Sequence, residues 1–167
     1  MDLIATNTRQ SNAGFDLAPP SAPQRQTLGG ALSALSRAER QVLLNHGTEA
    51  AFCGGLLDNK QAATYCCRLC GLPLFAAERK FESGTGWPSF TAPFAADHLN
   101  VVRDSSHGMT RTEIFCARCD SHQGHVFSDG PKPGGQRYCI NSVSLQFAPQ
   151  GQPLPDKLGR DEASKPV

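Results

Sequence analysis

Two segments, ATYCCRLCG at residues 63–71 and TEIFCARC at residues 112–119, decide the fold, because each contains two cysteines separated by two residues. A C-x-x-C turn places two sulfur atoms along one edge of a tetrahedral metal site, and two such turns complete a shell of four thiolates. A full shell leaves no position for water, so we expect a structural Zn²⁺ that clamps two distant hairpins together. The predicted ligands are Cys67, Cys70, Cys116 and Cys119.

The alternative is that one cysteine pair is redox-active and the other is incidental. Both pairs lie in similar strand-and-turn settings, which favours a shared metal site. Cys66 precedes Cys67 directly and would give a C-x-x-x-C spacing with Cys70. The matching two-residue gap of the second pair therefore assigns the ligand role to Cys67.

The rest of the chain from residue 52 to residue 147 alternates short apolar stretches with Gly, Pro, Asp or Asn. This pattern is typical of short antiparallel strands joined by turns, and RYCINSVSLQF at 137–147 is the clearest of them. One helix is predicted at 33–46, because Ser36 and Glu39 form a capping box and Gly47 follows. We expect a mainly β fold of two packed antiparallel sheets with a short N-terminal helix, clamped by the four-cysteine zinc site.

Both ends of the chain differ in composition from the middle. Residues 1–30 are rich in Asn, Ser, Gln, Pro and Gly, which predicts a disordered leader before a domain at 31–148. Residues 149–167 are again polar and are expected to form a flexible tail.

Overall charge and apolar runs exclude several functional classes. The formal net charge of +1 gives no electrostatic reason to expect a nucleic-acid or acidic-membrane partner. The longest apolar runs fall far short of the roughly 20 residues of a membrane helix. The N-terminus resembles no export signal and the number of cysteines, 7, is odd. A cytoplasmic protein is therefore expected, without a disulfide framework.

A third cysteine environment lies in RYCINS at 137–142. Strand alternation places Arg137, Cys139 and Asn141 on one face, where a cation and an amide favour a thiolate. The alternative is an inert buried thiol. His122 and His125 lie shortly after the second cysteine pair. They could be site residues or further metal ligands, and the alternative is that they are solvated loop residues.

Three motifs occur in one order: GTGWPSF at 84–90, HQGHVFSDGP at 122–131 and RYCINS. Together with the cysteine pairs they resemble the type B methionine sulfoxide reductases, from about Ser33 to Phe147. The resemblance implies reduction of the R-epimer of methionine sulfoxide in oxidised proteins. Cys139 is then the nucleophile, whose thiolate attacks the sulfoxide, releases methionine and becomes a sulfenic acid.

The resemblance also implies roles for the residues around Cys139. The imidazoles of His122 and His125 would polarise and protonate the sulfoxide oxygen, with Asn141 helping to hold a water or the substrate. Trp87, with Phe127, would form an apolar wall for the S-methyl group. The alternative for Trp87 is that it caps the core from a loop.

At one position this chain departs from the family pattern. Many members have a cysteine where Thr85 stands, and that cysteine resolves the sulfenic acid. Cys53, beside the flexible pair Gly54–Gly55, is the candidate for this role here, unless it is a structural thiol. A Cys53–Cys139 disulfide would then be reduced by thioredoxin.

Two other interpretations remain. A zinc-stabilised β domain can be a non-catalytic binding module, and a zinc ribbon can bind nucleic acid. A non-catalytic binding module would not require Cys139, His122, His125 and Trp87 to occur together, so their joint presence argues against the first interpretation. The second calls for basic and aromatic residues interleaved around the knuckles, which the sequence does not have.

Overall fold

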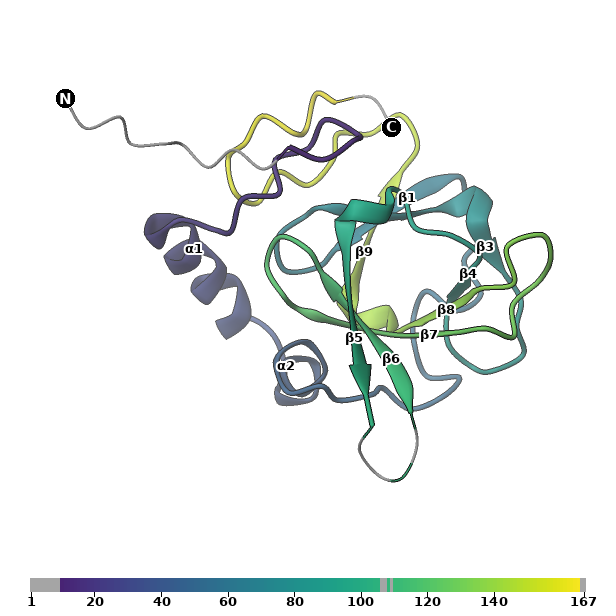
Figure 1. The fold of residues 1–167 in the computed structure, drawn as a ribbon. Helices are drawn as coiled ribbons and strands as arrows, with labels where there is room; N and C mark the ends of the chain where they lie inside the picture. Colours follow the sequence, from purple (N-terminus) through teal and green to yellow (C-terminus); the bar gives the residue numbers. More distant parts are fainter. Residues whose placement is uncertain (1–9, 106–107, 109, 166–167) are drawn as a thin grey trace.

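A computed structural model describes residues 10–105, 108 and 110–165 of the chain. Its strands form two antiparallel sheets (Figure 1), as the sequence predicts. The smaller sheet has the order β2 (Pro73–Ala76), β1 (Ala63–Cys67) and β9 (Leu145–Pro149). The larger has the order β3 (Lys80–Phe81), β4 (Ser89–Phe90), β8 (Arg137–Ile140), β7 (His122–Phe127), β6 (Arg111–Cys116) and β5 (Leu99–Asp104).

The aromatic core joins the two sheets. Phe75 of β2 stacks on Phe90 of β4 with ring centroids 4.4 Å apart, and Tyr65 of β1 meets the same ring edge-on at 5.2 Å. All three side chains are fully buried. Offset stacked and edge-to-face pairs are the favoured aromatic geometries, so these rings hold the sheets face to face.

The segment 137–147 is not one strand, which corrects the sequence prediction. It divides into β8 in the large sheet, the 3₁₀ turn η4 (Ser142–Ser144) and β9 in the small sheet. The turn is fixed by buried hydroxyls, since Ser144 Oγ donates to the carbonyl of His122 at 2.9 Å. Good strand formers continue through the segment, but a local pattern does not report where a chain passes from one sheet to another.

The N-terminal region contains two helices in place of the single predicted one, α1 (Ala22–Ser33) and α2 (Arg37–Leu44). The capping box of Ser36 and Glu39 is confirmed at the start of α2. After α2 the left-handed residue is His46, with φ 57°. Gly47 is needed because an added Cβ would lie 2.8 Å from the carbonyl oxygen of Gln41. Among the described residues, none of the helices has the length and apolarity needed to cross a membrane.

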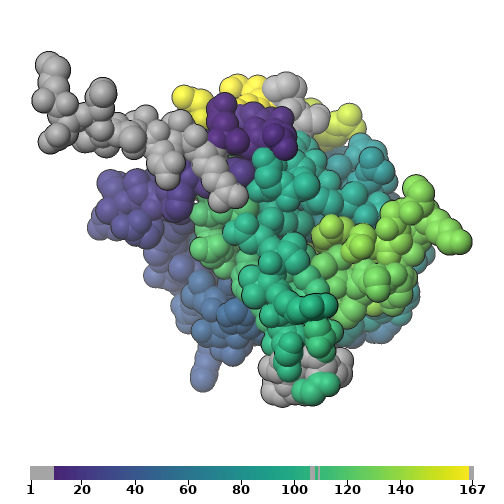
Figure 2. Space-filling view, in the orientation of Figure 1, coloured from purple at the N-terminus to yellow at the C-terminus, as the bar shows by residue number. Residues whose placement is uncertain are grey.

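The described part of the predicted leader packs on the domain instead of lying free. Phe15 and Leu17 are each 1% exposed, and both belong to the hydrophobic core. The C-terminal segment meets them: Arg160 Nη1 donates to the carbonyl of Asp16 at 3.0 Å, and Leu158 is buried. Figure 2 shows the two ends lying together on one face. The composition of each end, with few apolar residues, does not predict this packing. Residues 1–9 of the predicted leader lie outside the described residues.

Candidate active site and metal centre

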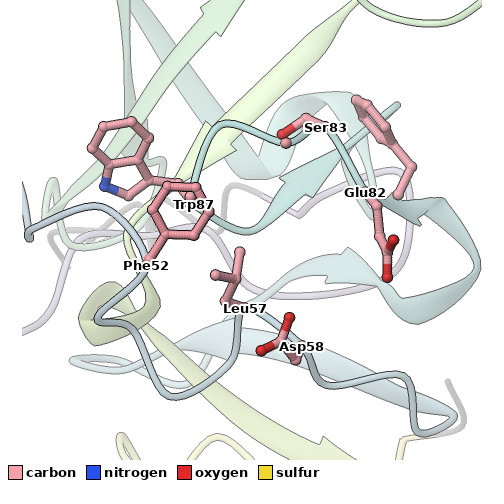
Figure 3. Close-up of a pocket in the computed structure, with 9 residues that line it drawn as sticks. Phe52, Leu57, Asp58, Glu82, Ser83 and Trp87 are labelled. Atoms are coloured by element: carbon pink, nitrogen blue, oxygen red, sulfur yellow. The ribbon is translucent and has the colours of Figure 1, made fainter.

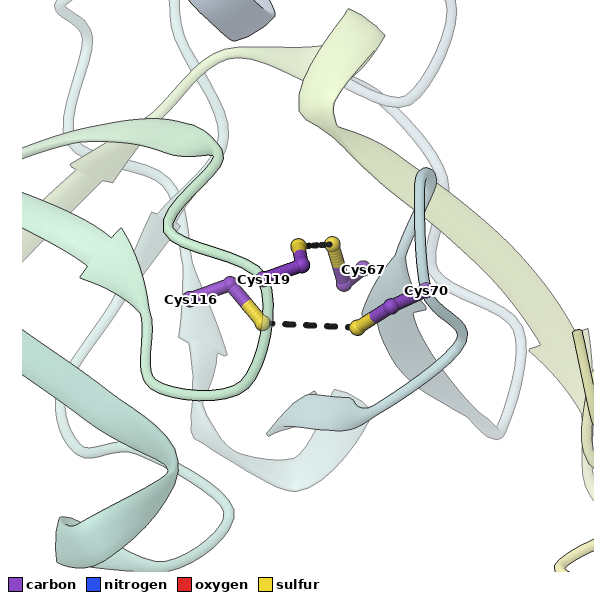
Figure 4. A group of neighbouring side chains, drawn as sticks. All are labelled: Cys67, Cys70, Cys116 and Cys119. Atoms are coloured by element: carbon purple, nitrogen blue, oxygen red, sulfur yellow. Dashed lines mark hydrogen bonds between the residues drawn. The ribbon is translucent and has the colours of Figure 1, made fainter. Parts of the chain in front are cut away.

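The four predicted metal ligands come together between the two sheets (Figure 4). Cys67 Sγ lies 3.6 Å from Cys119 Sγ, and Cys70 Sγ lies 3.5 Å from Cys116 Sγ. A tetrahedral site with metal–sulfur bonds of about 2.3 Å has edges of about 3.8 Å. The four sulfur atoms therefore have the spacing of one tetrahedral metal site.

The surroundings of these thiols also fit a cation. Burial raises the pKa of Cys116 well above its usual range, and the three neighbouring thiols add to the shift. Without a positive charge, four buried thiolates would repel one another. The group could thus hold a metal ion in its thiolate form. Cys66 is not part of this group of four sulfur atoms; its thiol is buried in the core, and burial raises its pKa to about 12.

A β-bulge decides how the two histidines lie. In the β6–β7 ladder Gly124 pairs with Ile114 and His122 pairs with Phe115, so Gln123 is an extra residue. Residues three apart on a regular strand point to opposite faces, but one inserted residue restores a common face. His122 and His125 therefore meet edge to face, with ring centroids 5.6 Å apart.

Burial favours the neutral form of both imidazoles. Burial lowers the pKa of His122 to about 4, and burial also lowers the pKa of His125. Both ring nitrogens of His122, and Nε2 of His125, have no hydrogen-bond partner among the described residues of the protein. Buried polar atoms are nearly always paired, so these nitrogens are suited to a polar ligand.

Cys139 lies at the centre of the large sheet, paired with His125 of β7 on one side and with Ser89 of β4 on the other. Residues that face each other in an antiparallel ladder have their side chains on the same face. Gly124 permits this pairing, because a Cβ there would lie 2.1 Å from the carbonyl oxygen of Cys139. The sulfur and the imidazole of His125 are therefore neighbours.

Burial raises the pKa of the Cys139 thiol, while the charge of Arg137 and hydrogen bonds from Thr85 and Arg137 oppose that rise. Arg137 is held in place by two hydrogen bonds to Asp129, of 2.9 and 3.1 Å, and its guanidinium lies 4.3 Å from the centre of the Phe127 ring. The predicted proximity of Arg137 to Cys139 is present. Phe127 is part of the same face of β7 and β8.

Asn141 directly follows β8, and its backbone is still extended, with φ −73° and ψ 129°. Its side chain is buried and joined to the backbone at both ends: Oδ1 accepts from the amide of Glu49 at 2.9 Å, and Nδ2 donates to the carbonyl of Gln123 at 3.1 Å. Asn141 thus joins the segment before Cys53 to the bulge of β7.

Trp87 lies half-buried on the loop between β3 and β4, and its Nε1 donates to the carbonyl of Glu49 at 3.0 Å. Its loop is built for turning, since Gly84 and Gly86 have φ of 74° and 90°. A cavity of about 360 Å³ lies against Trp87, with Phe52 and Ser83 also in its wall (Figure 3). Cys139 and the two histidines are not among its lining residues, so this cavity adjoins the cysteine site and does not contain it.

Cys53 is exposed on the loop that crosses the Trp87 segment. The amide of Phe52 donates to the carbonyl of Gly86 at 2.8 Å, directly beside Thr85. Gly54 packs tightly, because an added Cβ would lie 2.2 Å from Ser142 Oγ. The loop therefore has one anchored end near the Cys139 site, although Gly54 is less free than a glycine pair predicts.

Sequence reasoning missed three residues of this region. Glu49 contacts both Asn141 and Trp87 through its backbone. His46 Nδ1 lies 2.8 Å from Glu113 Oε2, and the same oxygen lies 3.5 Å from His122 Nδ1. Only the fold brings His46 and Glu113 together, since they are 67 positions apart. The capping box before His46 marks only the start of helix α2.

Comparisons with known proteins agree with this site. The SelR domain family matches residues 35–149. A protein of Caulobacter vibrioides (strain NA1000 / CB15N) named "Peptide methionine sulfoxide reductase MsrB" is 64% identical over 152 residues, which cover 91% of this chain and 94% of that protein. A protein of the same name from Xylella fastidiosa (strain M23) is 58% identical over 151 residues, 90% of this chain and 96% of that protein. The chain belongs to the SelR domain family, that of the type B methionine sulfoxide reductases.

Proposed function

We propose that this protein reduces methionine-R-sulfoxide in oxidised proteins to methionine, with Cys139 as the nucleophile. The observation that carries the proposal is the cross-strand pair of Cys139 and His125, whose Nε2 has no partner among the described residues. Membership of the family and the names of its relatives support the same reaction.

In the first step the Cys139 thiolate attacks the sulfoxide sulfur and forms a bond between the two sulfur atoms; the protonated oxygen then passes to the Cys139 sulfur, as the S–O bond of the substrate and the new sulfur–sulfur bond both break. The sulfur of the substrate gains two electrons and leaves as the thioether of methionine, while Cys139 becomes a sulfenic acid. The oxygen needs a proton as the bond breaks. His125 and His122 are the groups positioned to hydrogen-bond this oxygen and to orient a water that supplies the proton.

Thiolate formation is the second requirement. Arg137 and the hydroxyl of Thr85 oppose the rise in the pKa of Cys139 caused by burial. The aromatic rings of Trp87 and Phe127 supply apolar surface for the S-methyl group. With the methyl and the oxygen assigned to different surfaces, only one epimer presents its sulfur to Cys139.

Resolution is assigned to Cys53. Its thiol attacks the sulfenic sulfur, a disulfide forms between Cys53 and Cys139, and one water leaves. The exposure of Cys53 and the anchoring of its loop beside Thr85 support this assignment. A dithiol reductant of the thioredoxin class would then take the disulfide back to two thiols.

The four-cysteine group is assigned to a structural Zn²⁺, held by Cys67, Cys70, Cys116 and Cys119. When bound, the ion would stabilise the junction of the two sheets and take no part in the reaction, since four thiolates fill its coordination shell. The spacing of the sulfur atoms supports this assignment.

The test is a single turnover without reductant. Reduced, zinc-loaded protein is mixed with pure R- or S-methionine sulfoxide, methionine per enzyme is counted, and disulfides are mapped by mass spectrometry. The expected result is one methionine from the R-epimer alone and a Cys53–Cys139 bridge. R-specific turnover with Cys53 still free would remove the resolving role, and no methionine from either epimer would overturn the proposed function.

A further inference from the structure

A second cluster of metal-binding side chains lies behind the two histidines. It consists of His46 after α2, Glu113 of β6 and His122 of β7, and one ligand atom from each lies within 4.8 Å of the other two. The sequence separations are large, so the fold alone creates the group. None of the three is a ligand of the four-cysteine centre.

The spacing within this cluster is close to that of ligands on one ion. Glu113 Oε2 is 2.8 Å from His46 Nδ1 and 3.5 Å from His122 Nδ1. Adjacent ligands at about 2.05 Å from a metal are roughly 2.9 Å apart in octahedral and 3.3 Å apart in tetrahedral geometry. The side chain of His46 is 58% exposed. The imidazole of His46 can therefore rotate to bring its ligand nitrogen closer to that of His122, which is the third pair of ligand atoms in the cluster.

The second observation comes from His122. It is 1% exposed, and neither of its ring nitrogens has a hydrogen-bond partner among the described residues. His122 Nδ1 lies 3.5 Å from Glu113 Oε2 without a hydrogen bond to it, so this buried nitrogen is suited to a ligand that binds both the imidazole and the carboxylate. A cation there would pair both groups at once.

We propose that His46, Glu113 and His122 form a second metal site, which binds a divalent first-row transition-metal ion. Two imidazoles and one carboxylate favour Zn²⁺, Ni²⁺, Co²⁺ or Fe²⁺ over Mg²⁺ and Ca²⁺, which prefer oxygen ligands. Three protein ligands leave coordination positions for water, unlike the filled four-cysteine shell.

The site has a consequence for activity, and this part rests on the proposed function. An ion on Nδ1 fixes the ring of His122, which otherwise faces His125 and the sulfoxide oxygen. Metal binding is therefore expected to inhibit reduction of the substrate. The protein would be a reductase that loses activity when a free transition-metal ion is available.

The experiment titrates Ni²⁺ into zinc-loaded, reduced full-length protein. Ni²⁺ is the probe because Cu²⁺ oxidises thiols. Bound metal is counted after equilibrium dialysis, and NMR follows the ring protons of the histidines, which a paramagnetic ion broadens. His46→Asn removes one ligand and suits the left-handed backbone at φ 57°, and Glu113→Gln removes the carboxylate charge. The controls are Glu82→Gln, an exposed carboxylate elsewhere, and Cys53→Ser, which removes an exposed thiol.

The expected result is one Ni²⁺ beyond the structural zinc, with selective broadening of His46 and His122. Affinity should fall at least about tenfold in both cluster variants and stay unchanged in both controls. Unchanged affinity in His46→Asn, loss of binding in Cys53→Ser, or no Ni²⁺ bound to the wild type would overturn the site. If Ni²⁺ binds as expected but does not inhibit methionine formation, the metal site stands and its link to activity falls.

Discussion

Cys139 of β8 lies directly opposite His125 of β7, at one position of the antiparallel ladder. Facing residues of such a ladder have Cβ atoms about 4.5–5.5 Å apart, so the pairing itself places the thiol and the imidazole side by side on one face. The bulge at Gln123 then adds His122 to the same face. Strand pairing, and not a flexible loop, thus positions the three groups of the proposed reaction.

Replacement of His125 by Asn should slow the single-turnover formation of methionine by about a hundredfold or more, because the oxygen loses the imidazole that polarises it and orients the water that protonates it. Alkylation of Cys139 by iodoacetamide should stay close to the wild-type rate, since that reaction needs only the thiolate. Rapid-quench counting of methionine and mass spectrometry of the alkylated peptide measure the two rates. If both rates fall together, His125 acts on the ionisation of Cys139 and not on the sulfoxide.

Thr85→Val should shift the pH profile of Cys139 alkylation to higher pH. The direction follows because the hydroxyl of Thr85 lowers a thiol pKa that burial has raised. The thiolate population at neutral pH therefore falls and alkylation slows, while at high pH the two proteins become equal. Thr85→Ser keeps the hydroxyl and is the matched control; a profile for Thr85→Val that coincides with the wild type would exclude this role.

Gly124→Ala should destabilise the protein by about 1–3 kcal/mol, because the new methyl would lie 2.1 Å from the carbonyl oxygen of Cys139. Gly134→Ala is the control, since an added Cβ there meets nothing within 4 Å. Urea unfolding followed by tryptophan fluorescence compares the two variants. Equal midpoints for both would mean that β7 and β8 can separate without cost.

Loss of the four-cysteine ion should unfold the domain. Apparent binding energies of about 10–16 kcal/mol for such sites equal or exceed the total stability of about 5–15 kcal/mol typical of a protein. Cys116→Ser, or treatment of the wild type with a strong chelator, is therefore expected to abolish the cooperative thermal transition seen by circular dichroism. Cys53→Ser removes an exposed thiol and should melt like the wild type; a folded, metal-free Cys116→Ser protein would refute the dependence.

Acid should release the N-terminal segment. His98 is buried, with Nδ1 2.5 Å from the carbonyl of Pro73 and Nε2 2.9 Å from Ser11 Oγ, and burial lowers its pKa below 6.5. The unfolded chain then binds a proton at a higher pH than the folded one. Stability is present above pH 6.5 and is lost as the pH falls from there toward the lower folded value.

Limited proteolysis between pH 7 and pH 5 measures this release, with cleavage expected first around residues 10–20. A His98→Gln variant cannot take up the proton and should show a flatter dependence on pH. Cleavage that is independent of pH in the wild type would show that His98 does not control the docking of Ser11.

Several features could be predicted from short stretches of sequence, because their causes are local. The C-x-x-C spacing sets two sulfur positions within one turn, and the Ser36–Glu39 capping box fixes the start of α2 through two hydrogen bonds three residues apart. The apolar stretches separated by turn residues indicate the antiparallel class. The motifs and their order likewise indicate the family from sequence alone, because the residues of each motif are consecutive in the chain.

The tertiary structure decided the rest, because it depends on register and on contacts between distant segments. Alternation alone places His122 and His125 on opposite faces, and the bulge reverses that result. Phe15 is buried by the rings of Phe94 and His98 and lies under the ammonium group of Lys165, all of them distant in sequence. By itself, the sequence determined which cysteines are candidates for metal ligands and which for the proposed nucleophile; the fold decided which side chains surround Cys139, because burial and strand pairing are properties of the whole chain.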